Sequence, residues 1–106
     1  MTAESVVRAT GPGVTCTADG ARWIATGALT FANAGPVLAA ARALPLPATG
    51  VVDCSGIAAV DSATVALLLA VRRGAAARGA TLVFTGVPPA LATLASLYGV
   101  EEMLGG

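Results

Sequence analysis

The sequence predicts one α/β domain with a largely parallel four-stranded sheet, an N-terminal hairpin and packed helices. The chain has 106 residues, which is enough for one domain with one core but not for two. Near its start, two segments of strand-like composition flank an Asp-Gly turn signal. Beyond them, helical and strand-like segments alternate, and this pattern requires crossover connections between mostly parallel strands. The expected order of elements is β-β-α-β-α-β-α.

Residues 1–13 are expected to form a loose lead-in, and residues 14–106 the folded domain. The lead-in ends in a Gly-Pro-Gly sequence and has little hydrophobic periodicity. After it, apolar and polar side chains alternate on both sides of Asp19-Gly20, a dipeptide typical of tight hairpin turns. These features predict a β-hairpin over residues 14–26.

The next segment has the spacing of a helix that begins near Asn33. Apolar residues recur at helical intervals from Phe31 onward, and either Thr30 or Asn33 is available as the N-cap. Pro36 is tolerated only within the first turn, which favours a start close to Asn33. The helix should end before the Pro-Leu-Pro sequence at 45–47, because proline lacks a donor and pushes the preceding residue out of the α region.

A short strand and a long helix follow. Residues 50–55 form a mostly apolar run of the kind that is buried on both faces of a sheet. Residues 63–77 contain no proline and consist mostly of strong helix formers. The first ten are apolar on every side, so one buried stripe does not account for them. Arginines near the C-terminus complement the helix macrodipole, and Gly79 is suited to end the helix.

The C-terminal part of the chain predicts one more strand and one more helix. Residues 80–85 have strand composition and are ended by Gly86. Pro88-Pro89 is suited to the first turn of a helix, which should extend to Gly99.

Composition excludes several kinds of function. The formal net charge is zero, and the basic residues do not form a nucleic-acid footprint. The chain has neither His nor Lys, so the usual general base, the commonest metal ligand and the lysine of a phosphate-binding loop are missing. Cys16 and Cys54 have neither the spacing nor the companion ligands of a zinc or redox site, and we expect two buried reduced thiols. No metal, cofactor or catalytic residue is predicted.

Hydropathy and charge indicate where the protein resides. The chain has no run of about 20 apolar residues that could span a membrane, and its N-terminus lacks the basic and apolar regions of a signal peptide. We therefore expect a cytoplasmic protein. With 56% hydrophobic and only 11% charged residues, its surface should be poorly soluble alone and covered by a partner. In isolation a monomer or a weak homodimer is expected.

The segment from Asp53 to Thr64 is the candidate functional site. It is expected to turn from strand to helix and so to bring two carboxylates and three hydroxyls to one helix N-terminus, from Asp53, Ser55, Asp61, Ser62 and Thr64. Asp61 or Ser62 can act as the N-cap, which contributes about 1 kcal/mol. Three interpretations remain open: capping alone, a surface that binds a partner, and an acid–base pair of Asp53 and Asp61, for which no supporting motif is present.

At these residues the sequence resembles STAS domains, named for sulfate transporters and anti-sigma-factor antagonists. The shared pattern is Asp53-x-Ser55, four further residues, and Val60-Asp61-Ser62-Ala63, and the resemblance covers roughly residues 20–104. The segment 94–100 is most similar to MlaB-type STAS subunits of the Mla phospholipid-transport ABC system. The resemblance implies a STAS-type fold and a non-enzymatic interaction subunit that binds and regulates or stabilises an MlaF-like cytoplasmic ATPase. Contact with the membrane permease would then be indirect.

The two branches of the family differ at the second residue after the aspartate, and this sequence can be compared with both at that position. Antagonists switched by a kinase typically read Asp-Ser-Ser-Gly and are phosphorylated on the second hydroxyl residue, where this chain has Ala63. MlaB-type subunits resemble this chain in having a hydroxyl only directly after the Asp, at Ser62. Thr64 replaces the family's glycine and adds a hydroxyl. The alternative that the resemblance implies is an anti-sigma-factor antagonist that binds a serine kinase or anti-sigma factor through the same surface.

The resemblance and the residue types together define the expected partner-binding residues, which are Asp61, Ser62, Ala63, Thr64 and Tyr98. Ser62 is also a candidate for phosphorylation, because a helix N-terminus accommodates phosphate, although Asp61 would repel the added charge. Tyr98 is either a core or rim aromatic or, beside Leu97, an interface anchor.

Overall fold

The computed structural model describes residues 13–104. The predicted lead-in lies outside the described residues except for Gly13, which is the first residue of β1. The elements are β1 (Gly13–Cys16), β2 (Arg22–Leu29), α2 (Ala34–Arg42), β3 (Val51–Val60), α3 (Ser62–Ala77), β4 (Val83–Thr85), α4 (Pro89–Leu97) and a short 3-10 helix, η1 (Glu101–Leu104). This order confirms the predicted one, with η1 added at the end.

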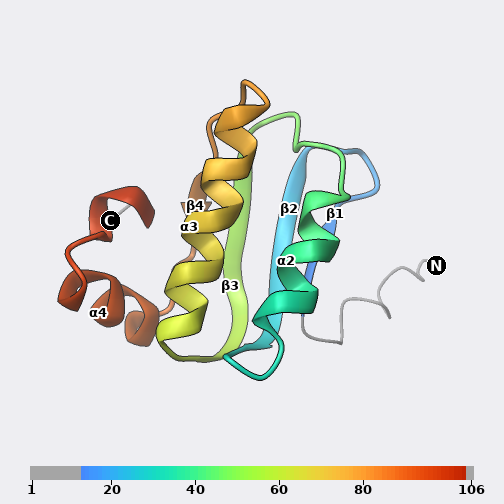
Figure 1. Ribbon diagram of the computed structural model, residues 1–106. Helices are drawn as coiled ribbons and strands as arrows, with labels where there is room; N and C mark the ends of the chain where they lie inside the picture. The colour runs from blue at the N-terminus through green and yellow to red at the C-terminus, as the bar shows by residue number, and fades with distance from the viewer. Residues whose placement is uncertain (1–12, 105–106) are drawn as a thin grey trace.

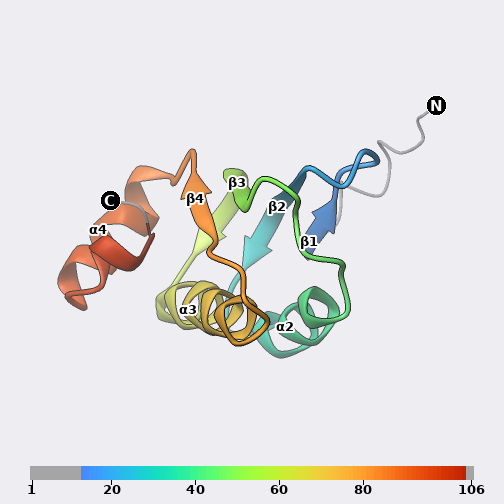
Figure 2. The ribbon, with the colours of Figure 1, turned by 90° about the horizontal axis from the view of Figure 1, so that it is seen from above.

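The strands form one sheet in the order β1-β2-β3-β4 (Figure 1). β1 is antiparallel to β2, whereas β3 is parallel to both of its neighbours, β2 and β4. Figure 2 shows α2 and α3 side by side on one face of the sheet, with α4 beyond the β4 edge. The prediction of a largely parallel four-stranded sheet with an N-terminal hairpin is therefore confirmed.

The core lies between the sheet and the pair α2 and α3. Trp23 and Leu29 on β2 and Val52 on β3 are buried beneath Val37 of α2 and Leu68 of α3. Burial of a side chain of this size stabilises the fold by about 1.5–3 kcal/mol. The Trp23 indole Nε1–H also donates to the carbonyl of Pro45 at 2.8 Å, which satisfies the polar atom of an otherwise apolar site.

The all-round hydrophobicity of α3 has a structural cause. The helix packs against the sheet and is contacted by α2 on one side and by α4 and η1 on the other. Val65, Leu67 and Leu68 therefore point in different directions, yet all are at least 97% buried. A central helix with three packed sides needs apolar residues around most of its circumference.

Two strands differ in length from the prediction. β3 continues to Val60 instead of ending near Ser55, because the ladder with β2 passes the register shift between Ile24 and Thr26 and resumes at Gly56. The interpretation of residues 53–64 as a turn is therefore wrong, since most of this segment is strand. β4 has only three residues, because its pairing with β3 is confined to Val51, Val52 and Asp53.

The two cysteines differ in environment. Cys54 is fully buried, whereas Cys16 is only partly buried, so the prediction of two buried thiols holds for Cys54 alone. Within residues 13–104, no helix is both long and apolar enough to cross a membrane.

Candidate functional site

Asp61 fixes the start of α3. It is the N-cap residue, and its Oδ1 accepts a hydrogen bond of 2.8 Å from the backbone N–H of Ala63. Its Oδ2 accepts a second one of 3.0 Å from the backbone N–H of Phe31, in the loop between β2 and α2. Both carboxylate oxygens are thus occupied by backbone donors, and Asp61 joins a distant loop to the helix N-terminus.

Thr64 completes a capping box with Asp61. Its hydroxyl accepts from the backbone N–H of Asp61 at 3.0 Å and donates a short hydrogen bond to the carbonyl of Leu29. The Thr64 side chain is fully buried. The partner contact expected from Thr64 is therefore not available to it, because the hydroxyl that replaces the family's glycine is turned inward to connect β2, β3 and α3.

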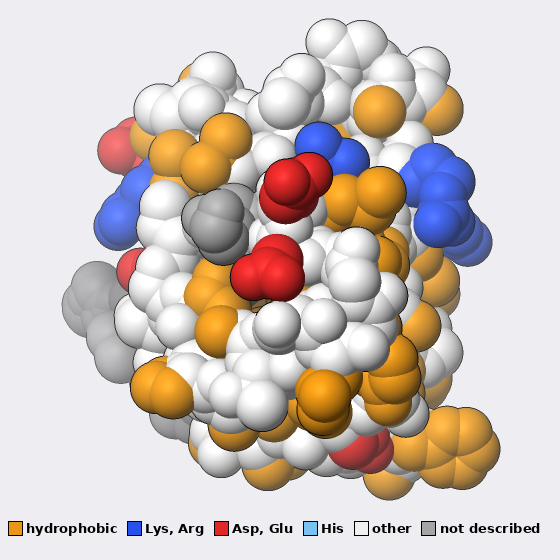
Figure 3. All heavy atoms as spheres, turned by 90° about the vertical axis from the view of Figure 1, so that its left-hand side faces the viewer, with side chains coloured by type: hydrophobic (Ala, Val, Ile, Leu, Met, Phe, Trp, Pro, Cys, Tyr) orange, Lys and Arg blue, Asp and Glu red, His pale blue; other side chains and the backbone are white. Residues whose placement is uncertain are grey.

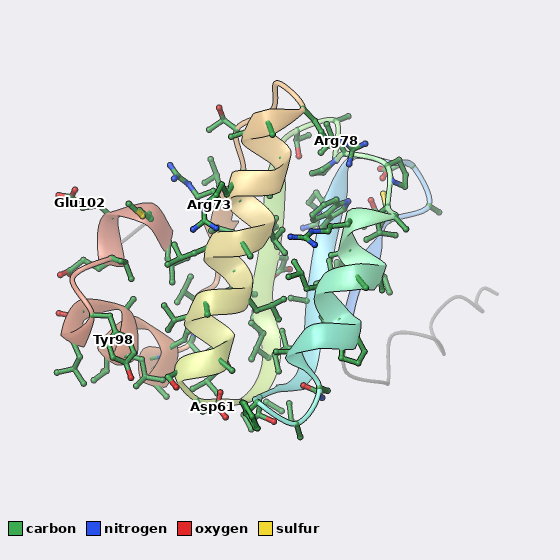
Figure 4. The ribbon with its side chains drawn as sticks, in the orientation of Figure 1. Asp61, Arg73, Arg78, Tyr98 and Glu102 are labelled. Carbon is green, nitrogen blue, oxygen red and sulfur yellow. The ribbon has the colours of Figure 1, made fainter. Side chains whose placement is uncertain are left out.

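Ser62, Ala63 and Tyr98 lie at the surface to different degrees. Ser62, the first residue of α3, is exposed, while Ala63 is partly buried. Tyr98, the C-cap of α4, is 54% exposed, and the preceding Leu97 is 74% exposed. Figure 4 shows Asp61, at the start of α3, and Tyr98, at the end of α4, both in the lower part of the molecule.

Phe31 belongs to the same end of the molecule and was not expected there. The helical spacing of the sequence includes it, but α2 begins only at Ala34, so Phe31 lies in the preceding loop and is 85% exposed. Asn33 holds this loop, because its side chain accepts from the Thr30 N–H and donates to the Ala28 carbonyl. The position of Phe31 before the favoured cap, Asn33, is the sequence signal that excludes it from the helix face.

Asp53 and Ser55 lie far from this end. Asp53 is near the start of β3 and Asp61 directly follows its end, eight positions further along, which in extended strand corresponds to about 26 Å. This distance excludes an acid–base pair. The Ser55 hydroxyl donates to Asp53 at 2.7 Å and the Ser55 N–H at 2.9 Å, and these bonds hold the pKa of Asp53 below its ordinary value. Arg22, 3.9 Å away, contributes in the same direction.

The described residues hold neither a metal-binding cluster nor a reactive buried thiol. Among residues 13–104, no three Cys, Asp or Glu side chains gather in a way that could hold a metal ion. Burial raises the pKa of the Cys54 thiol to about 12, which keeps it protonated and unreactive near neutral pH.

The sheet order, the helix pair on one face and the capped start of α3 agree with a STAS domain. A protein-family model described as an MlaB-type STAS domain matches residues 20–105. The chain therefore belongs to the MlaB-type STAS domain family. A search of curated proteins found no significant match. STAS domains usually act as interaction or regulatory modules and are typically not enzymes.

Proposed function

We propose that this protein binds the cytoplasmic ATPase of an Mla-type phospholipid ABC transport system and stabilises or regulates that ATPase. The surface that makes the contact is the docking end, defined as Phe31, Ser62, Leu97 and Tyr98. The proposal rests on exposed apolar side chains near a helix start whose Asp61 carboxylate already accepts two backbone hydrogen bonds. The protein would reach the membrane only through this partner.

The exposure of these side chains supports an interface. Five large hydrophobic side chains are exposed in the described part of the chain, and three of them, Phe31, Leu97 and Tyr98, belong to the docking end. Large exposed apolar groups at one site of a protein commonly mark a binding surface, and aromatic residues often anchor it. Ser62 directly follows Asp61 and is a small exposed residue, which leaves room for a partner side chain.

The internal bonding of Asp61 supports the same role. Because both of its carboxylate oxygens accept backbone hydrogen bonds, Asp61 presents no unpaired charge to a partner. A partner can therefore cover the helix start without desolvating a free carboxylate, a step that would be costly.

Charged side chains lie on the face of the molecule that carries α4 and η1. Glu101 and Glu102 are both exposed on η1, which follows α4, and Figure 4 shows Glu102 at the height of Arg73, well away from Asp61. Figure 3 shows acidic side chains near the middle of this face with basic ones close by, and hydrophobic ones along its lower part. The docking end itself is mainly apolar, so its partner is expected to offer an apolar surface there.

The same surface would serve an anti-sigma-factor antagonist, but the usual phosphate acceptor is missing. The second position of the helix is Ala63, which has no hydroxyl, and the hydroxyl of Thr64 is buried. Ser62 alone remains exposed, and binding to a kinase instead of an ATPase is one of the outcomes of the experiment below.

The experiment is to co-express the full chain with the Mla-type ATPase subunit of the same genome and to measure the affinity of the purified pair. Ser62→Glu should weaken binding more than tenfold, because its carboxylate would be desolvated against the partner. The variant should fold normally, since a carboxylate at an exposed helix N-terminus is favourable.

Two controls separate charge from size and position. Ser62→Gln has nearly the same size without the charge and should bind more tightly than Ser62→Glu. Ala39→Glu adds the same carboxylate to an exposed position of α2 and should bind like the wild type. If the chain does not bind the ATPase, or binds a serine kinase or anti-sigma factor instead, the proposed function is wrong. Unchanged affinity of Ser62→Glu would remove Ser62 from the interface.

A further inference from the structure

A cavity of about 240 Å³ opens at the end of the molecule opposite to the docking end. It lies between the C-terminal halves of α2 and α3, and its inner wall is apolar, formed by Trp23, Ala41, Leu46, Val71 and Ala75. A dry apolar cavity of about 150 Å³ is enough to hold benzene. This cavity can therefore accept a hydrophobic group of a ring or a short alkyl chain.

Two guanidinium groups complete the lining. Arg42 is the last residue of α2, and Arg78 is the C-cap of α3. In the described residues neither forms an ion pair, and Arg78 makes only a long hydrogen bond of 3.4 Å to the carbonyl of Leu44. Figure 4 shows Arg78 at the top of α3, on the side toward α2. The lining thus combines an apolar wall with two cations and no carboxylate.

Gly74 keeps the cavity open. It lies within α3 and lines the cavity, and a Cβ added there would meet no atom within 4 Å. Packing therefore does not require a glycine at this position, although glycine inside a helix is less favourable than alanine. Three alanines follow it directly. Alanine, which packing and helix propensity would both allow, is thus absent at a position that lines the cavity.

We propose that this cavity binds a small amphiphilic carboxylate, with its apolar tail against Trp23 and its carboxylate between Arg42 and Arg78. An arginine fork matches the geometry of a carboxylate, and Arg is always charged. The positive charges of the two arginines should repel an ammonium ion with the same apolar tail. The proposed ligand site is independent of the docking end, because Ser62 and Arg78 lie at opposite ends of α3, about 24 Å apart.

The helix macrodipoles oppose the binding of an anion here, but their effect is smaller than that of the two arginines. Both helices end at this cavity, and a helix C-terminus carries about half a negative charge. Four carbonyls in the last turns of the two helices, those of Ala40, Ala41, Ala75 and Ala76, however accept backbone hydrogen bonds. Two full positive charges on side chains that reach beyond the helix ends outweigh these partial, hydrogen-bonded charges.

Octanoate is the probe for this site, and Trp23 is the reporter. Trp23 is the only tryptophan of the chain and lines the cavity, so its fluorescence should change on binding. We expect saturable binding of octanoate to the full chain with a dissociation constant on the order of 0.1–1 mM, as for other ligands of about ten non-hydrogen atoms. Octylammonium and acetate should bind at least tenfold more weakly, because one has the wrong charge and the other no tail.

Paired variants locate the binding. Gly74→Leu should fill the cavity and weaken octanoate binding at least tenfold without lowering the melting temperature, whereas Ala77→Leu, on an exposed position of the same helix, should not weaken it. Arg42→Gln should weaken binding about fivefold or more, and Arg73→Gln, outside the cavity lining, should not. Absence of saturable binding, equal binding of octylammonium, or unchanged binding by Gly74→Leu and Arg42→Gln would each overturn the proposal.

Discussion

Replacing Thr64 by valine tests whether the start of α3 is held as described. Valine has the shape of threonine but lacks the hydroxyl, so the buried carbonyl of Leu29 loses its donor and the N–H of Asp61 its acceptor. An unsatisfied buried polar group costs about 1–3 kcal/mol, and the group at Asp61 is only partly buried. We therefore expect the free energy of unfolding to fall by about 2–4 kcal/mol. This is a large part of the 5–15 kcal/mol typical of a domain.

The assay is urea and thermal denaturation at neutral pH, followed by circular dichroism. A loss of this size lowers the melting temperature by roughly 10–20 °C in a domain of this length. Thr64→Ser is the matched control, because it keeps the hydroxyl and loses only a buried methyl group, at a cost of about 1 kcal/mol. If Thr64→Val is as stable as Thr64→Ser, the hydroxyl does not join β2 to α3 and the description of the site is wrong.

Three further predictions concern other parts of the domain. Gly50→Ala should cost at least 1 kcal/mol more in unfolding free energy than Gly79→Ala. Both glycines have positive φ, but only at Gly50 would a Cβ lie 2.6 Å from a backbone oxygen. Equal costs would contradict the close approach of this oxygen to Gly50. In the native protein iodoacetamide should alkylate Cys16 before Cys54, as measured by mass spectrometry. Because the pKa of Cys54 is raised by burial, the free energy of unfolding should fall as the pH rises from 9.0 toward about 12. The lowered pKa of Asp53 contributes stability above pH 3.8 that is lost on further acidification. Asp53→Asn should therefore flatten the acid limb of a stability–pH curve. An unchanged acid limb would count against the bonding of Asp53 by Ser55 and Arg22.

The order of elements could be predicted from the sequence because it depends on local signals. Prolines mark where helices begin and end, and the apolar periodicity changes from strand to helix after the hairpin. The length of β3 could not be predicted in this way. Gly56 reads as the end of a strand, but in the structure it pairs with Thr26 after a register shift, a contact between two strands that local composition does not encode.

The candidate site was predicted in part. The sequence indicated Asp61 as one of two possible caps and Ser62 as the neighbouring surface hydroxyl, and the structure makes Asp61 the cap. The inward position of Thr64 was missed, although Asp-x-x-Thr has the spacing of a reciprocal cap. Phe31 was missed because its attachment to Asp61 joins residues thirty positions apart, and only the packed fold brings them together.

The double use of Asp61 also affects the thermodynamics of association. A flexible loop that carries an aromatic anchor loses conformational entropy when a partner immobilises it, and this loss reduces affinity. Here the backbone of Phe31 is already tied to the helix cap by a 3.0 Å hydrogen bond in the free protein, so mainly the ring's own rotations remain to be frozen. Under the proposed function, most of the loop's ordering would therefore precede binding, and Asp61 would contribute to recognition by holding the loop.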